Sequence, residues 1–174
     1  MPSDFFIRIY ILPYHQLFGV CLCCLVLFWE LRRRFERRLW WRWMIGAVLM
    51  LWAAVVIQST VLGRSNGTGS QWALIPLHSY REVLSGGNPE ILRANLMNVV
   101  LFIPAGLLTA ALLPGDWPPA RQLLIITVLG SVFSLGIECT QYARSLGCPE
   151  IDDVIHNTIG AVAGFCALSN NRNK

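Results

Sequence analysis

Residues 43–63 read WMIGAVLMLWAAVVIQSTVLG, an apolar run without one charged side chain. An α-helix rises about 1.5 Å per residue, so a run of this length crosses a hydrocarbon core about 30 Å thick. Trp40 and Trp41 stand just before the run, where an interfacial aromatic belt is expected. This stretch therefore predicts a transmembrane helix.

Four further windows resemble this one in hydropathy, although the last is short. They cover residues 11–31, 95–113, 122–142 and 153–168. The composition agrees, because 55% of the residues are hydrophobic and 14% are charged, against about 45–50% and about 25% in a soluble domain. The mean hydropathy is +0.51. We expect one all-α membrane domain over residues 1–174, a polytopic bundle of about five transmembrane helices.

Basic residues set the expected orientation of the bundle. Six arginines lie between Arg32 and Arg42, and the positive-inside rule places such a block in the cytoplasm. Nine Lys and Arg residues then lie inside (32, 33, 34, 37, 38, 42, 121, 172, 174) and five outside (8, 64, 81, 93, 144). We expect the N-terminus outside, the C-terminus in the cytoplasm and no nucleic-acid partner. The alternative is that the 32–42 segment binds RNA or a partner protein.

The connection at residues 64–93 is external in this orientation. Its stretch WALIPLHSY, residues 72–80, is too apolar for a free loop and too short to span. We expect it to lie in the membrane interface or to dip into the mouth of the bundle, bringing His78 and Arg81 there.

The cysteines predict neither a disulfide framework nor a metal site. The sequence has six, and five of them lie inside apolar runs, so a pair that staples loops is missing. Cys21, Cys23 and Cys24 lack metal-ligand spacing and are interpreted as small buried hydrophobes.

Polar residues form stripes on the last three predicted helices. Steps of three and four residues place one set on a single face of helix 122–142: Thr127, Ser131, Ser134, Glu138 and Gln141. A second set shares a face of helix 153–168: Asp153, Asn157, Gly160 and Gly164. The glycines allow another backbone to come close, and we expect helix 122–142 to be that neighbour. Asn98 lies near the external end of helix 95–113.

Five of these polar residues lie toward the external ends of their helices, and we expect them to surround a small wet cavity: Glu138, Gln141, Asp153, Asn157 and Asn98. On insertion scales, a charged side chain at the membrane centre raises the free energy of insertion by about 2.5 to 3.5 kcal/mol. A carboxylate in a membrane helix therefore indicates a structural partner or a function. Glu138 and Asp153 are predicted as acceptors, proton carriers or catalytic groups. The predicted ligand-binding residues are His78, Arg81, Asn98, Gln141, Arg144, Asp152, His156 and Asn157.

A purely structural interpretation is the alternative. Asp152 or Asp153 could cap a helix, and Asn98 and Gln141 could form interhelical hydrogen bonds. Glu138 could pair with Arg81 or Arg93 in an ion pair.

Two other kinds of site were weighed against this cavity. His156 follows Asp152 by four residues, so the two could bind a metal with Glu138, but a lone His near an interface more often packs, and no metal or cofactor is predicted. A catalytic Ser/His/Asp site at Ser79 or Ser145 is not favoured, because no motif around either serine would activate its hydroxyl as a nucleophile.

Three motifs resemble the VanZ-like family of bacterial membrane proteins. They are NVVLFIPAG at residues 98–106, ECTQ at 138–141, and IDDVIHNTIG at 151–160 followed by Gly164. The resemblance covers roughly residues 74–165. It marks Pro76, Asn98, Pro104, Gly106, Glu138, Gln141, Asp153, Asn157 and Gly160.

The chain departs from the family pattern in two places. It has Ala73-Leu74-Ile75-Pro76-Leu77 where members often have Asn-Leu-x-Pro-Phe, and Gly147-Cys148 where they often have Gly-Arg. An external anion site that relies on that arginine is therefore expected only if Arg144 takes its place.

The resemblance implies a protein of a bacterial plasma membrane that acts at the outer face on cell-envelope chemistry or on access of a teicoplanin-type glycopeptide. Its expected partners are membrane lipids and an envelope precursor or lipid-linked substrate. One alternative is an intramembrane hydrolase or transferase with Glu138 and Asp153 as acid and base. Another is a non-catalytic subunit that docks a cytoplasmic protein through Arg32–Arg42.

Overall fold

The computed structural model describes residues 26, 30, 39–62, 73–146 and 149–172. Its elements are α3 (Leu39–Ile57), a π-helical turn η1 (Gln58–Leu62), α4 (His78–Leu84), α5 (Glu90–Leu112), α6 (Pro119–Ala143) and α7 (Ile151–Arg172). Within these residues the only strand-like pairing is an isolated bridge between Ala73 and Glu150. The prediction of an all-α fold is confirmed.

Three helices are long and apolar enough to cross a membrane: Trp40–Leu62, Glu90–Leu112 and Pro119–Ala143. They coincide with the predicted windows 43–63, 95–113 and 122–142, so the chain is a multi-pass membrane protein. The window 153–168 is also helical, as the central part of α7, but α7 is not one of these three candidate spans in the described chain. The window 11–31 and the 32–38 part of the arginine segment lie outside the described residues, apart from 26 and 30.

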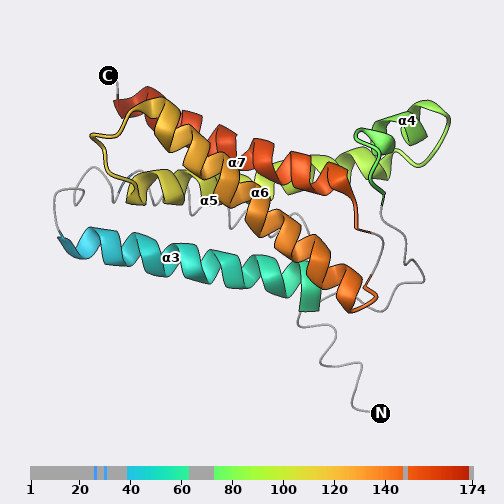
Figure 1. Ribbon diagram of the computed structural model, residues 1–174, viewed down its shortest axis with the longest axis horizontal. Helices are drawn as coiled ribbons and strands as arrows, with labels where there is room; N and C mark the ends of the chain where they lie inside the picture. Colours follow the sequence, from blue (N-terminus) through green and yellow to red (C-terminus); the bar gives the residue numbers. More distant parts are fainter. Residues whose placement is uncertain (1–25, 27–29, 31–38, 63–72, 147–148, 173–174) are drawn as a thin grey trace, which may run out of the picture.

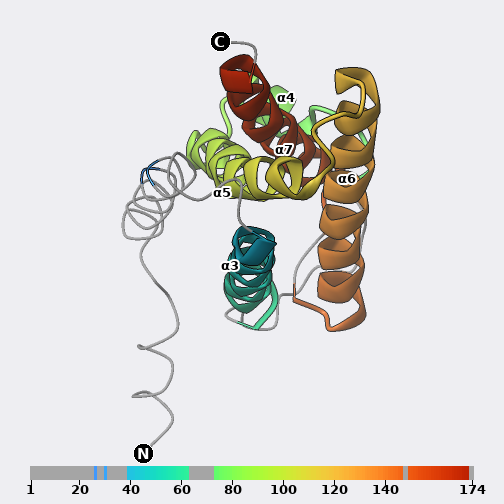
Figure 2. The ribbon, with the colours of Figure 1, turned by 90° about the vertical axis from the view of Figure 1, so that its left-hand side faces the viewer.

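Successive long helices run in opposite directions (Figure 1). The start of α5, the end of α6 and the start of α7 therefore lie toward the same end of the bundle as α4, and we call it the α4 end. Figure 2 shows α6 crossing beside the other helices at a steep angle. The alternating helix directions thus put the polar ends of α5, α6 and α7 on one side of the bundle, as the predicted cavity requires.

Proline and glycine set the helix boundaries. Pro118 and Pro119 begin α6, where a missing N–H group loses no helical hydrogen bond. After α4, Gly86 has a φ of 92°, which a side chain would disfavour, and the chain turns back into α5. The short helix α4 lies within the predicted external connection, residues 64–93, and begins inside its apolar stretch 72–80.

Helices α5 and α7 are packed backbone to backbone. A Cβ atom added to Gly106 would fall on the backbone of Ala161, and one added to Gly160 would fall on Val99. Gly164 meets Ile103 in the same way. The expectation that the α7 glycines face helix 122–142 is therefore wrong. A glycine has no side chain, so the backbone of any neighbouring helix can approach it closely. Here the neighbour is α5, whose own Gly106 allows the same close approach from the other side.

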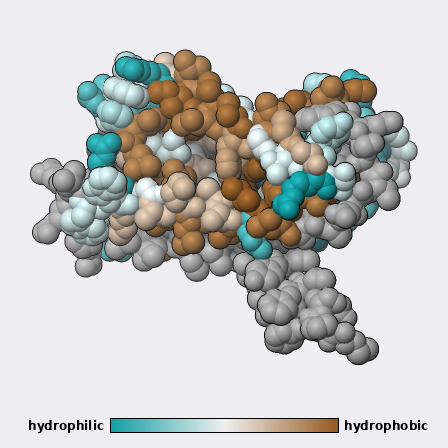
Figure 3. Space-filling view, turned by 60° about the horizontal axis from the view of Figure 1, so that its bottom comes forward, coloured by the Kyte–Doolittle hydropathy of each residue, from teal (hydrophilic) through white to brown (hydrophobic). Residues whose placement is uncertain are grey.

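Apolar packing fills the remaining space, and apolar side chains also cover the outside. Trp52 packs edge-on against Phe102 with ring centroids 5.5 Å apart. On the outside, Trp43 is 78% exposed and Met50 71%. Figure 3 shows hydrophobic surface over much of one face, with hydrophilic patches toward its ends and a further one within it.

Candidate polar site at the α4 end

The first turn of α7 is held by contacts from three other segments. The backbone of Ala73 brackets its start, with Ala73 N–H donating to Pro149 O (2.9 Å) and Ile151 N–H donating to Ala73 O (3.1 Å). Asp152 and Asp153 occupy the first turn, where the positive end of the helix dipole favours negative charge. This turn is the point around which the polar residues gather.

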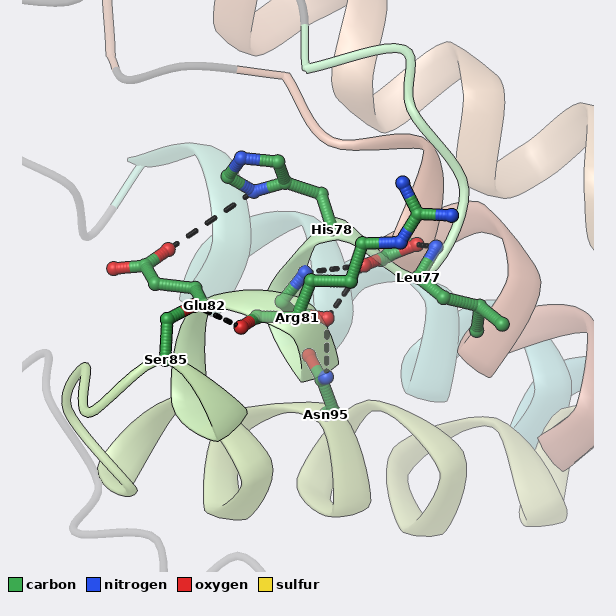
Figure 4. A network of polar contacts seen from close by, with 8 residues as sticks. Leu77, His78, Arg81, Glu82, Ser85 and Asn95 are labelled. Atoms are coloured by element: carbon green, nitrogen blue, oxygen red, sulfur yellow. Dashed lines mark hydrogen bonds and ion pairs between the residues drawn. The ribbon is translucent and has the colours of Figure 1, made fainter.

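Asp152 anchors α4. Its carboxylate, in a residue only 2% exposed, accepts hydrogen bonds from Leu77 N–H (2.5 Å), Ser79 N–H (3.0 Å) and the Ser79 hydroxyl (2.5 Å). The Asn95 amide, rising from α5, donates to the same Ser79 hydroxyl at 2.9 Å (Figure 4). The Asp152 carboxylate thus joins α7 to the start of α4, and the Ser79 hydroxyl joins α4 to α5.

The charge state of Asp152 follows from these contacts. Burial raises the pKa of its carboxyl, but the hydrogen bonds from Ser79 and Leu77 outweigh burial and hold the pKa below its ordinary value. Asp152 is therefore ionised at neutral pH. Leu77 has a φ of 61°, unusual for a branched side chain, and its N–H points to this carboxylate.

His156 lies one turn below Asp152 and joins α7 to α4. Its Nδ1 is 2.6 Å from the Asp152 carbonyl oxygen, and its Nε2 is 2.8 Å from the Tyr80 hydroxyl. A carbonyl oxygen only accepts, so Nδ1 carries the proton and Nε2 accepts from Tyr80. Both ring nitrogens of this buried histidine are thus engaged.

The two carboxylates singled out by the sequence lie on either side of the same turn. Glu138, 2% exposed, accepts a hydrogen bond from Glu150 N–H at 3.1 Å. Asp153 accepts one from the Asn98 amide of α5 at 2.7 Å. Glu150 O in turn accepts from Asp153 N–H at 3.2 Å, which links the two backbone positions. The structure thus brings α5, α6 and α7 together through these side chains.

The polar stripe of α6 continues toward the middle of the bundle. Gln141 donates to Thr60 O in the π-helical turn η1 (3.1 Å). Ser134, one turn deeper than Glu138, accepts from the Asn157 amide at 2.8 Å. Ser131 bonds Thr158 at 2.9 Å. The predicted stripe therefore faces α7 over most of its length.

A comparison with protein-family models places the chain. The VanZ/LLP1 model matches residues 20–170. The chain belongs to the VanZ/LLP1 family. It is thus a VanZ-like membrane protein, of a family linked to antibiotic resistance. No match was found among curated proteins or among solved structures.

Three predicted ligand-binding residues of this VanZ/LLP1 protein lie on the surface. His78 faces Glu82 at 4.0 Å on the outer side of α4, and its side chain is 53% exposed (Figure 4). Arg81 is also exposed on α4, and Arg144 is exposed at the C-terminal end of α6. The structure does not bring these three into the buried cluster with Glu138.

The structure of this VanZ/LLP1 protein bears on two alternatives, an ion pair between Glu138 and Arg93 and a metal site that includes His156. Arg93 pairs with Glu90 at 3.4 Å on the exposed side of α5. Within the described chain, no three His, Cys, Asp or Glu side chains are placed to hold a metal ion. His156, proposed for such a site, directs its nitrogens to Tyr80 and to a backbone carbonyl instead.

The sequence did not predict Ser79 and Tyr80 as members of the cluster, and it assigned no ligand-binding role to Asn95 or Ser134. Ser134 had a signal, because it lies on the Glu138 stripe. Asn95 precedes Asn98 by three residues and so shares its side of α5. Ser79 and Tyr80 had none, because their contacts depend on how α4 rests on α7.

Proposed function

We propose that this VanZ/LLP1 protein lies in a bacterial plasma membrane and binds an envelope lipid or a peptidoglycan-related group at the α4 end. Binding there would lower susceptibility to teicoplanin-type glycopeptides. The observation that carries the proposal is the burial of the Glu138 carboxylate, which contacts the start of α7 through Glu150 N–H. An amide would suffice for packing, whereas a carboxylate inside a bundle is costly and marks function by default.

Charge distribution supports placing the α4 end outside. At the opposite end of the bundle, the Arg42 side chain donates a hydrogen bond to the carbonyl oxygen of Leu112, the last residue of α5 (3.0 Å). At the same end, the Arg121 guanidinium lies 3.9 Å from the centroid of the Trp117 ring. Arginine and tryptophan at one end of the bundle suit a cytoplasmic interface. The N-terminus would then be outside and the C-terminus in the cytoplasm.

Recognition is favoured over acid–base chemistry by the donors around the two carboxylates. A catalytic pair uses one protonated and one ionised carboxyl group. Here Glu138 accepts from a backbone N–H and Asp153 accepts from Asn98. Each carboxylate is thus placed as a hydrogen-bond acceptor, which suits binding of a ligand that donates hydrogen bonds.

Drug susceptibility provides the test. A glycopeptide-susceptible host would express the wild type, Glu138→Gln, or the control Glu90→Gln, whose carboxylate is 67% exposed. We expect the wild type and the control to raise the inhibitory concentration of teicoplanin, and Glu138→Gln at equal membrane level to lose most of that increase. Full protection by Glu138→Gln would contradict the proposal.

A further variant separates binding from docking. Replacing Arg32, Arg33 and Arg34 by glutamine alters the arginine segment and leaves the sequence of the α4 end unchanged. If this variant loses protection while Glu138→Gln keeps it, the protein acts as a subunit that docks a cytoplasmic partner. Mass spectrometry of co-purified lipids and envelope precursors, compared between wild type and Glu138→Gln, then identifies what the α4 end holds.

A further inference from the structure

The chain from Leu74 to Leu84, which we call the α4 segment, exposes several large apolar side chains. Leu84 is 88% exposed, Leu74 62%, Ile75 55% and Leu77 51%. Apolar residues that are exposed singly are ordinary on a protein surface, whereas a group of them marks an interaction with a protein or a membrane. The α4 segment is therefore a candidate interaction surface.

The polar side chains of α4 lie on a different side of the helix. At about 100° per residue, His78, Glu82 and Ser85 fall within about 60° of one another, and Leu84 lies about 120° from His78. His78 faces Glu82 at 4.0 Å on this polar side, as Figure 4 shows. Tyr80 lies opposite His78 and is 38% exposed. The helix is thus amphipathic, and the protein covers only part of its apolar side.

Two hydrogen bonds place α4 along the length of the bundle. The Ser79 hydroxyl accepts from the amide of Asn95 (2.9 Å), which lies in the second turn of α5. The Tyr80 hydroxyl bonds to Nε2 of His156 (2.8 Å), which lies in the second turn of α7. Helix α4 therefore lies beside the first two turns of both helices and not beyond their ends.

Exposed side chains indicate where lipid begins along α5, which is a candidate span. Arg93 and Glu90 form an exposed ion pair at 3.4 Å in its first turn, and Leu96, three residues later, is 61% exposed. Insertion scales favour leucine in the hydrocarbon and disfavour charged side chains there. Asn95 lies between these two levels, so its hydrogen bond holds Ser79 of α4 at the boundary of the hydrocarbon.

The backbone at both ends of α4 is paired within the protein. At its start, the N–H groups of Leu77 and Ser79 donate to the Asp152 carboxylate. At its end, the N–H groups of Ser85 and Gly86 donate to carbonyl oxygens of the last turn. A segment in contact with lipid has no water to satisfy its backbone, so this pairing meets the requirement for such a segment.

We propose that the α4 segment lies in the membrane at the boundary between head groups and acyl chains, where Leu74, Leu77 and Leu84 contact lipid. Its partner is the bilayer leaflet at the α4 end, because its apolar side chains lie at the depth where α5 begins to expose leucine. The polar side of the helix, with His78 and Glu82, then faces head groups and water, as in other interfacial amphipathic helices. This inference goes beyond the proposed function and does not depend on what the polar site binds.

Spin labels measure the depth of these side chains. In full-length protein whose six cysteines are replaced by serine, a nitroxide is attached at Leu84→Cys, Glu82→Cys or Leu96→Cys. Each protein is reconstituted into vesicles of phosphatidylethanolamine and phosphatidylglycerol. Oxygen concentrates in lipid and a nickel chelate stays in water, so the ratio of their collision rates with the label reports its depth.

We expect the ratio of oxygen to nickel collisions at position 84 to be severalfold higher than at position 82. It should be close to the ratio at position 96, which lies on the exposed surface of a candidate span. Glu82 is the matched control, because it lies in the same helix and its side chain is 48% exposed. A label at Leu74→Cys, ahead of the helix, provides a second apolar position that should also give a high ratio.

Equal ratios at positions 84 and 82 would overturn the inference, because α4 would then lie wholly in water or wholly in lipid. A label at position 84 that neither oxygen nor the nickel chelate reaches would also overturn it, because a protein partner or a second copy of the chain then covers this surface. High ratios at positions 74 and 84 with a low ratio at position 82 support it. None of these outcomes alters the teicoplanin test of Glu138.

Discussion

The Asn98 amide donates a 2.7 Å hydrogen bond to the Asp153 carboxylate, tying α5 to α7 across 55 residues of sequence. A hydrogen bond to a charged group contributes about 1.5 to 3 kcal/mol. Asn98→Ala should lower the free energy of unfolding by that amount, measured by thermal denaturation in detergent. Asn170→Ala, at an exposed position near the other end of α7, should change it by less than about 0.5 kcal/mol. Equal effects would show that the bond stabilises nothing.

Glycine packing between α5 and α7 gives the second prediction. Gly106→Ala places a methyl group onto the backbone of Ala161, so the helices must separate, at a cost of about 1 to 3 kcal/mol or more. Gly136→Ala in α6 has nothing within 4 Å of the added atom and should be neutral or stabilising by up to about 1 kcal/mol. Thermal denaturation of both variants, side by side, checks this contrast. A loss at Gly136 as large as at Gly106 would show that the contact with Ala161 is not the cause, because alanine itself favours a helix over glycine.

The Asp152 anchor predicts a pH dependence of α4. The pKa of Asp152 in the folded protein is below its ordinary value, so its contribution to stability is complete above about pH 4 and is lost as the pH falls through the lowered pKa. Hydrogen exchange of the α4 amides, corrected for intrinsic rates, should show protection at pH 6 and less protection near pH 3. Asp152→Asn should show weak protection at both values. A variant with the wild-type pH profile would exclude Asp152 as the titrating group.

Orientation can be measured by thiol labelling. In a variant whose six cysteines are replaced by serine, Ser85→Cys introduces a thiol after α4 and Asp116→Cys introduces one in the α5–α6 connection. A membrane-impermeant maleimide applied to intact cells should label position 85 and not position 116. After permeabilisation both should react. The reverse pattern would invert the proposed topology.

Hydropathy and helical periodicity predicted much of this structure. The runs at 43–63, 95–113 and 122–142 reappear within α3–η1, α5 and α6, because span length depends on local composition alone. The stripe ending in Glu138 and Gln141 does face its neighbours, because residues three and four apart share a helix face whatever packs there.

The partners of each face could not be predicted in the same way. Periodicity shows that Gly160 and Gly164 share a side of α7 but not that α5 is the helix opposite. The contact between Leu77 N–H and Asp152 joins residues 75 apart in sequence. The rotation of α4 decides that Ser79 is buried while His78 faces outward, and no local pattern in a seven-residue helix specifies that rotation.

The backbone contact between α5 and α7 has a consequence for membrane insertion. Helix α7 is not among the candidate spans of the described chain, whereas α5 is. A segment that partitions weakly into lipid can still enter when an inserted neighbour offers matching small residues and hydrogen-bond partners. Since α5 is synthesised first, we expect it to serve as an intramolecular template for the insertion of α7. Mutations at Gly106 would then appear first as a biogenesis defect, with the C-terminal helix left outside the bilayer.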